Sequence, residues 1–252
     1  MAKQSFIDGI QVLTHKNHLE VTLCLSCNNK KDYFTEVSLI RGEYVLAFAA
    51  AGVKDGRSRH NLLPSPVKFW LPELPHLYNL EVKLFNSDGG EMDSKTVRMG
   101  FRDVVFCGEG LFLNGRMICP AVIDLTNRAT DPQEVKFLKA RWDVNLVLCR
   151  IDRNTDAFLS ECDRQGRLAA ALLPAGYGRV DISQAILHLG WHPALCAWTV
   201  EELGWGKKIA PQMAKEDPRR ALLHLECKTG NTLILGSKGE KTQLAGGIAL
   251  VV

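Results

Sequence analysis

Two consecutive β-hairpin signals between residues 78 and 118 constrain the fold of this chain more than any other stretch. Apolar residues from Tyr78 to Leu84 alternate with polar ones, which is the period of a half-buried strand. Residues 86–90 (Asn-Ser-Asp-Gly-Gly) predict a turn because they tolerate positive φ, and the alternation resumes over residues 97–101. Asn114-Gly115 lies between two apolar segments and is typical of a type I′ turn. This stretch therefore predicts antiparallel sheet.

Further short strands are expected in the first hundred residues. We expect strands at 10–13, 19–25, 37–40 and 44–48, and a loop at 52–66, which is rich in Gly, Ser, Asn and Pro. Short strands at about ten-residue spacing, with turn signals between them, are typical of a β-sandwich.

After residue 118 the pattern changes to alternating strands and helices, which predicts parallel strands joined by crossover helices. The expected strands cover residues 117–123, 144–149, 168–173, 194–200 and 221–225. A first helix is expected to start at Asp131-Pro132, and others to cover residues 156–165, 183–188 and 207–215. Gly166 is expected to end the second helix. In the first helix, Val135, Leu138 and Trp142 fall on one face.

An ordered set of motifs resembles glycoside hydrolase family 2, which includes β-galactosidases, β-glucuronidases and β-mannosidases. The motifs are Trp70-x-Pro72-Glu73-x-Pro75-x-Leu77-Tyr78, Gly100-Phe101-Arg102 and Leu113-Asn114-Gly115-Arg116. The strings FIDGIQVLTHKNHLEVTLCLS and FLSECDRQGRL also resemble family segments. The resemblance implies a multidomain β plus α/β fold. We expect an immunoglobulin-like β-sandwich over residues 1–105 and a partial (β/α) TIM-type barrel over residues 106–252.

The barrel is expected to be incomplete. A full (β/α)₈ barrel takes about 250 residues, whereas fewer than that remain here after the sandwich. An open half-barrel exposes strand edges. We therefore expect that the last two apolar runs, at 232–235 and 248–252, cover the open edge, that a partner chain or self-association covers it, or that the chain is part of a longer protein. In the family a sugar-binding domain precedes the sandwich, and we expect no counterpart of it in these 252 residues.

Hydrolysis of a glycosidic bond uses two carboxyl groups, and the resemblance indicates where the first would lie. The family's acid/base Glu follows an Asn at the end of strand four, and residues 191–203 resemble this region through Trp198. Without a gap, Leu203 falls on the catalytic position. With one residue deleted Glu202 falls there, and Glu201 replaces the Asn. Glu202 is therefore the expected catalytic residue, with Glu201 as the alternate.

The second carboxyl group is harder to find. In the family the nucleophile lies on strand seven, which this chain is not expected to contain. Asp124, Asp152 and Glu226 lie near the ends of expected strands, where each serves either as a recruited carboxylate or as a surface or capping residue. Catalysis is therefore expected to be impaired.

Two further residues are expected to bind substrate. Arg150, after Asn145, resembles the family's Asn-x-Val-Arg, although the spacing is one residue longer; a guanidinium there can bind a carboxylate or sugar hydroxyls. Trp205 is flanked by glycines in a predicted loop and is expected to stack on a sugar ring. Core packing is expected for Trp70 and Trp198.

The resemblance leaves two function classes open. One is a retaining glycosidase acting on β-linked glycosides, or a protein derived from one, with carbohydrate as its ligand. The other is a non-catalytic pseudoenzyme that binds carbohydrate or protein through the same cleft.

Composition and charge argue against several other classes of protein. The net charge of +3 and the absence of a basic stripe interleaved with aromatics argue against nucleic acid as a partner. No apolar run approaches the roughly 20 residues of a membrane span. Eight cysteines lie mostly in apolar runs, and the Cys24-x-x-Cys27 pair lacks the two further ligands of a zinc site, so no metal and no cofactor are expected. Reduced thiols predict a cytoplasmic protein.

Overall fold

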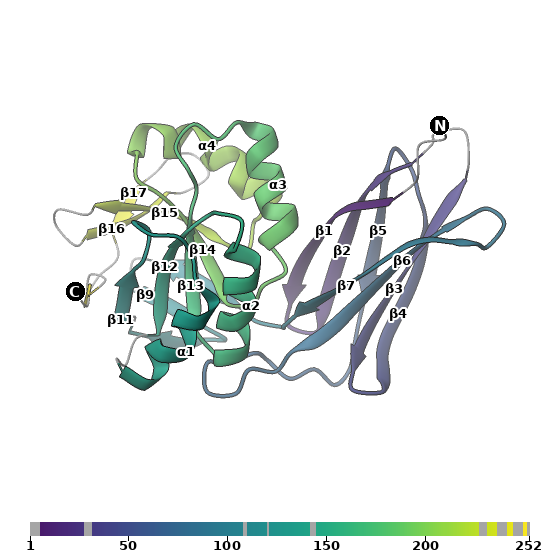
Figure 1. Cartoon of the computed structure of the whole chain (residues 1–252), viewed down its shortest axis with the longest axis horizontal. Coiled ribbons are helices and arrows are strands. Elements are labelled where there is room, and N and C mark those ends of the chain that lie inside the picture. The colour runs from purple at the N-terminus through teal and green to yellow at the C-terminus, as the bar shows by residue number, and fades with distance from the viewer. Residues whose placement is uncertain are drawn as a thin grey trace.

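The structure is a computed structural model that describes residues 6–27, 32–107, 110–119, 121–141, 145–226, 231–235, 241–243 and 249–250. Its side chains are described as far as residue 224, apart from 139–141. Figure 1 shows an all-strand half at the right and, at the left, a half in which helices cover a sheet. The fold class expected from the sequence is confirmed: a sandwich followed by a partial α/β barrel.

Two antiparallel sheets form the sandwich. One has the strand order β1-β2-β5 and the other β4-β3-β6-β7. Their bounds are β1 Phe6–His15, β2 His18–Ser26, β3 Tyr33–Arg41, β4 Tyr44–Gly52, β5 Arg57–Leu62, β6 Tyr78–Asn86 and β7 Glu91–Met99. Burial alternates along most of these strands, as period-two patterning requires. The hairpin predicted around residues 86–90 is the β6–β7 connection.

The predicted loop at 52–66 is wrong, because it contains β5. The side chains that β5 buries on alternate positions include Ser58 and His60, so the strand carries little apolar signal. Thr35 on β3 compensates these polar groups: its hydroxyl lies 2.8 Å from Ser58 Oγ and 2.9 Å from His60 Nε2. Burial of polar groups is tolerated when they are hydrogen-bonded to one another, which a count of apolar residues does not detect.

Three short strands follow the sandwich: β8 Val104–Cys107, β9 Gly110–Leu113 and β10 Arg116–Ile118. The predicted Asn114-Gly115 turn joins β9 to β10, and both residues have positive φ, 51° and 78°, as a type I′ turn requires. The strand predicted over 117–123 is two strands, since β10 ends at Ile118 and the parallel sheet starts at Ala121. The Asn145 amide separates them by binding both Ala121 N–H (2.8 Å) and Cys119 O (3.1 Å).

The second half is built on one sheet with the order β17-β16-β15-β14-β13-β12-β11-β18. β11 Ala121–Asp124, β12 Leu146–Arg150, β13 Leu168–Leu172, β14 Leu195–Val200 and β15 Ala221–Glu226 are parallel neighbours. β16 Asn231–Leu235 and β17 Lys241–Gln243 add antiparallel strands beside β15, and β18 Ala249–Leu250 pairs with β11. The tail therefore extends both edges of the parallel sheet. Among the described strands, no pairing joins β17 to β18 and closes a barrel.

Four helices cover one face of this sheet (Figure 1). They are α1 Pro132–Arg141, α2 Thr155–Gln165, α3 Arg179–Leu189 and α4 Leu203–Glu216. α1 starts as predicted, with Asp131 Oδ1 accepting Gln133 N–H at 2.9 Å, and α2 ends at Gly166 with φ 65°. α3 and α4 are longer at both ends than predicted. The expected place of Trp142 on the face of α1 lies outside the described residues. No helix in the described ranges is long and apolar enough to cross a membrane.

A buried aspartate in α2 joins the two halves. Asp163 Oδ2 lies 2.6 Å from His192 Nδ1, and its Oδ1 accepts Ala194 N–H at 2.8 Å. The Asp163 carbonyl accepts the indole N–H of Trp70 at 2.9 Å. Trp70 belongs to the segment between β5 and β6, yet it packs in the core of the α/β half. One residue therefore fixes the sandwich segment and the loop before β14 together.

Gly166 shows how closely the halves are packed. A Cβ added there would lie 1.9 Å from the Pro72 carbonyl oxygen. We predict that Gly166→Ala loses about 2–5 kcal/mol of unfolding free energy, because left-handed backbone strain and overlap with Pro72 act together. Gly176→Ala is the control: its φ is 91° with no atom within 4 Å, so it should lose about 1–2 kcal/mol. Urea unfolding measures both, and equal losses would contradict the packing argument.

The contact region between the two halves, around Asp163, His192 and Trp70, is called the joint below. His192 makes the unfolding free energy of the protein depend on pH. Burial alone would lower the pKa of His192, but the charge of Asp163 and hydrogen bonds to Asp156 and Asp163 outweigh burial and raise the pKa to about 9. The native protein then binds more protons than the unfolded chain between pH 6.5 and about 9. The unfolding free energy should therefore fall as pH rises through this window, by up to about 3 kcal/mol.

Urea unfolding at a series of pH values tests this dependence. His192→Gln should remove most of the slope between pH 6.5 and 9, whereas His188→Gln, an exposed change in α3, should keep it. A slope that persists in His192→Gln would assign the pH dependence to other groups.

Candidate functional site

The carboxyl ends of the parallel strands meet at one edge of the sheet. The strand register puts Asp124, Arg150 and Thr199 on the same face, which is opposite to Trp198. The Trp198 indole donates to Asp217 Oδ2 at 2.8 Å, at the end of α4, so Trp198 lies on the helix-covered face. Asp124, Arg150 and Thr199 therefore belong to the face that would line a barrel, at the end where active sites of such barrels lie.

Glu202 follows the carboxyl end of β14 and is the N-cap residue of α4. It is exposed, and its carboxylate makes no capping hydrogen bond; its backbone carbonyl accepts Gly206 N–H at 2.9 Å. Since the side chain is not required to start the helix, its carboxylate is available to a ligand.

Glu201, the alternate catalytic residue, is also exposed. Its backbone carbonyl lies 3.1 Å from Nε2 of the buried His224 on β15. This contact fixes the backbone of the β14–α4 connection from the neighbouring strand. Two adjacent carboxylates therefore project at this edge from an anchored backbone.

Arg150 is the last residue of β12 and its side chain is exposed. It pairs with Leu172 on β13, which in turn pairs with Thr199 on β14. Arg150 therefore lies two strands from the Glu201–Glu202 connection, about 10 Å along the sheet. Asn145, by contrast, lies at the opposite end of β12, where it bridges β10 and β11, and takes no place at this edge.

Trp205 lies in the first turn of α4, so its expected place in a loop is wrong. The two flanking glycines suggested a loop, but Ile209, Ala210 and Met213 bury one face of the helix and stabilise it. Trp205 is half-buried and packs against the α/β core. Its exposed part lies within one helical turn of Glu202.

The three candidates for the second catalytic carboxylate differ in whether their side chains are free to act on a substrate. Asp152 accepts hydrogen bonds from Thr130 N–H (2.8 Å), Thr130 Oγ1–H (2.5 Å) and Asn154 N–H (2.9 Å). Burial acts to raise the pKa of Asp152, but these hydrogen bonds prevail and lower it. Asp152 therefore holds the connections around α2 in place. Asp124 is exposed and accepts two hydrogen bonds from Thr126. The side chain of Glu226 lies outside the described residues.

Two buried polar atoms near this edge were not identified from the sequence. Thr199 Oγ1 and His224 Nδ1 have no hydrogen-bond partner in the described part of the chain. Both residues lie inside apolar strand segments and resemble core positions, so no sequence signal distinguishes them. Buried polar atoms of this kind mark positions where a ligand or water supplies the missing partner.

No group of three or more His, Cys, Asp and Glu side chains within the described ranges is arranged to hold a metal ion. Cys24 and Cys27 are free thiols, and burial, the largest cause, raises the pKa of each.

Sequence comparison identifies relatives over much of the chain. Residues 5–102 match the family Glycosyl hydrolases family 2. A β-galactosidase of Thermoanaerobacterium thermosulfurigenes is 26% identical over 156 residues, which are 53% of this chain and 21% of the relative. A β-galactosidase of Pectobacterium atrosepticum is 26% identical over 170 residues, covering 59% of this chain and 16% of the relative. The matched part is thus about one fifth of these enzymes.

Solved structures share the fold over a longer stretch. The β-glucuronidase of Parabacteroides merdae superposes with a TM-score of 0.72 at 18% identity, covering 89% of this chain and 35% of that protein. A β-galacturonidase of Eisenbergiella tayi gives a TM-score of 0.71 at 18% identity over 90% of this chain and 47% of that protein. The sandwich and the partial barrel are therefore an arrangement found in these proteins. This chain is similar to glycoside hydrolase family 2 proteins and spans between one sixth and one half of the length of those it matches.

Proposed function

We propose that this chain binds a β-linked glycoside at the carboxyl edge of its parallel sheet and hydrolyses it poorly or not at all. Glu202 is assigned to the position of the acid/base, with Glu201 as alternate, and Arg150 and Trp205 to substrate binding. The single observation that carries the assignment is the position of Glu202, exposed directly after β14 and not used in capping α4.

The chemistry of the edge suits a sugar. Half-buried Trp205 offers an aromatic surface fixed by packing, and Arg150 offers N–H donors to hydroxyl or carboxylate oxygens. Thr199 Oγ1, which has no partner in the described part of the chain, leaves a polar position on the same face of the sheet. Aromatic surface with a few fixed polar groups is typical of small-molecule sites.

The arrangement of the carboxylates supports the proposal that catalysis is impaired. A retaining glycosidase places its two carboxyl groups about 5–5.5 Å apart. Asp152 is engaged by Thr130 and Asn154, and Asp124 lies on β11, three strands from β14 and about 14 Å away along the sheet. Glu202 itself is exposed, whereas a general acid is usually desolvated. A non-catalytic relative that binds carbohydrate fits these features; an active glycosidase would need a nucleophile from elsewhere.

Turnover assays separate the two functions. The substrates are the nitrophenyl β-galactoside, β-glucuronide and β-mannoside, tested with the natural chain, Glu202→Gln and Glu201→Gln. Because no second carboxylate is in place, we expect all three proteins to release nitrophenol at the same background rate. Release that is lost only in Glu202→Gln would contradict impaired catalysis and identify an active enzyme.

Binding is tested separately by calorimetric titration with the same glycosides. Trp205→Leu keeps apolar packing and removes the aromatic surface, so it should weaken binding about three- to tenfold. Phe137→Leu is a matched control on exposed α1 and should bind like the natural chain. Absence of saturable binding to all three glycosides would overturn the proposed ligand class.

Three further assignments remain proposals. A cytoplasmic location is supported by the free cysteines of the described residues. The division into units 1–105 and 106–252 is supported by two separate buried clusters, one in the sandwich and one around the parallel sheet. A partner chain or a second copy, if one covers the sheet, would meet it at β17 or β18, which are its outer strands.

A further inference from the structure

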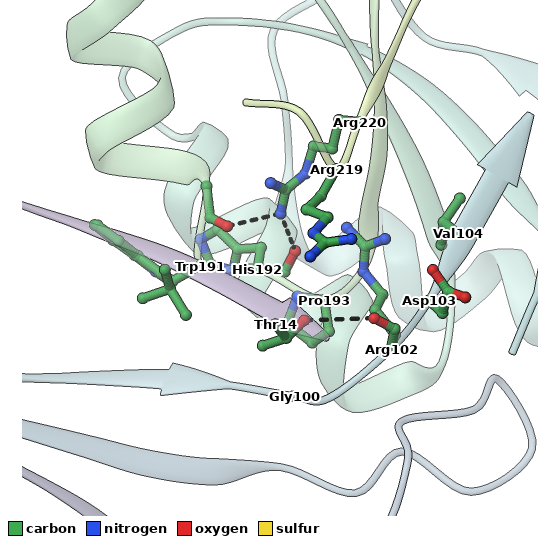
Figure 2. Close-up of a pocket in the computed structure, with 12 residues that line it drawn as sticks. Thr14, Gly100, Arg102, Asp103, Val104, Trp191, His192, Pro193, Arg219 and Arg220 are labelled. Atoms are coloured by element: carbon green, nitrogen blue, oxygen red, sulfur yellow. Dashed lines mark hydrogen bonds between the residues drawn. The ribbon is translucent and has the colours of Figure 1, made fainter. Parts of the chain in front are cut away.

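A pocket at the joint between the halves is lined by three arginines, Arg102, Arg219 and Arg220. Figure 2 shows their guanidinium groups gathered in the same space above Pro193. Asp103 is the only acidic residue among the described residues that line this pocket. Arg102 follows β7 of the sandwich, and Arg219 and Arg220 precede β15. The pocket therefore exists only when the two halves are packed together.

Two of the guanidinium groups are held close to each other. Arg102 is 7% exposed, and its Nη2 donates to the Leu195 carbonyl oxygen. Arg220 Nε donates to the same oxygen at 2.6 Å. Two positive groups that share one carbonyl acceptor repel each other, and burial strengthens the repulsion because solvent screening is reduced.

Arg220 forms an ion pair, whereas Arg102 forms none among the described residues. Arg220 Nη1 lies 3.0 Å from Asp217 Oδ2, and its Nη2 donates to the carbonyls of Gly190 (2.7 Å) and His192 (3.1 Å), two of the contacts drawn in Figure 2. In the described part of the chain Arg102 forms no ion pair. Burial, followed by the charge of Arg220, lowers the pKa of Arg102 to about 9.

Arg219 supplies the accessible side of the pocket. It is exposed, and no carboxylate of the described residues lies within ion-pair distance of its guanidinium. In the described part of the chain the pocket thus combines a buried cation that has no ion-pair partner with an exposed cation beside it. Guanidinium groups bind planar and tetrahedral oxyanions through paired N–H donors.

We propose that this pocket binds a small oxyanion of the phosphate or sulfate class between Arg102 and Arg219. The interior is narrow and admits an ion of a few atoms but no sugar ring. Such an ion would give Arg102 a direct ion-pair partner and link the end of β7 to the start of β15. It is a structural ligand of the joint, distinct from the glycoside at the opposite end of the sheet.

The test uses inorganic phosphate as the probe, at pH 7.5. Calorimetric titration gives the affinity, and thermal unfolding gives the shift in midpoint, with sodium chloride at matched ionic strength as reference. Arg219→Gln removes the exposed donor without disturbing a buried contact. Arg59→Gln, an exposed change on β5, removes one positive charge away from the pocket.

Phosphate should bind saturably to the natural chain and to Arg59→Gln and raise the unfolding midpoint of both. Arg219→Gln should weaken the affinity about tenfold, the effect of losing a charged hydrogen-bond donor. Phosphate also stabilises proteins non-specifically. The difference in phosphate affinity and midpoint shift between Arg219→Gln and Arg59→Gln therefore decides whether the pocket binds phosphate. Equal phosphate effects in Arg219→Gln and Arg59→Gln, or no saturable binding to the natural chain, would overturn the proposal.

Discussion

Asp163 is the residue on which the arrangement of the two halves depends. It is buried, binds His192, and accepts the backbone N–H of Ala194 just before β14. Through its carbonyl it also holds Trp70, which comes from the other half of the chain. A buried carboxylate is costly unless it is fully hydrogen-bonded. Here His192 and Ala194 satisfy it and order the loop before β14, whose Trp191 packs against the sandwich core.

This joint also determines where the candidate glycoside site lies. The loop that Asp163 fixes leads directly into β14, and the carboxyl end of β14 carries Glu201 and Glu202. At the amino end, the same packing gathers Arg102, Arg219 and Arg220 into the pocket of Figure 2. The two ends of the sheet thus present different chemistry: carboxylates with a tryptophan at one end, and a cluster of guanidinium groups at the other.

Much of the fold could be predicted from the sequence because its signals are local. The Asn114-Gly115 turn, the Gly166 helix end and the alternation along β6 each depend on neighbouring residues only. The features that were missed depend on distant residues. β5 buries Ser58 and His60 against Thr35, and the break between β10 and β11 is fixed by Asn145. Neither effect is visible in a short window of sequence.

The candidate site was only partly predictable. The motif at 191–203 indicated Glu202 at the end of a strand, but the start of α4 and the place of Trp205 depend on burial of Ile209 and Met213. The arginine pocket was not predicted at all, because Arg102 and Arg219 are far apart in sequence and meet only through the joint.

Differential scanning calorimetry of Asp163→Asn tests the central role of this carboxylate most directly. If Asp163 holds the halves together, the natural chain should unfold in one transition. The variant loses the charge that His192 requires, which loosens the loop whose Trp191 packs against the sandwich core. It should therefore show two separate transitions for the sandwich and the α/β half. A single transition of the variant at the midpoint of the natural chain would contradict the account.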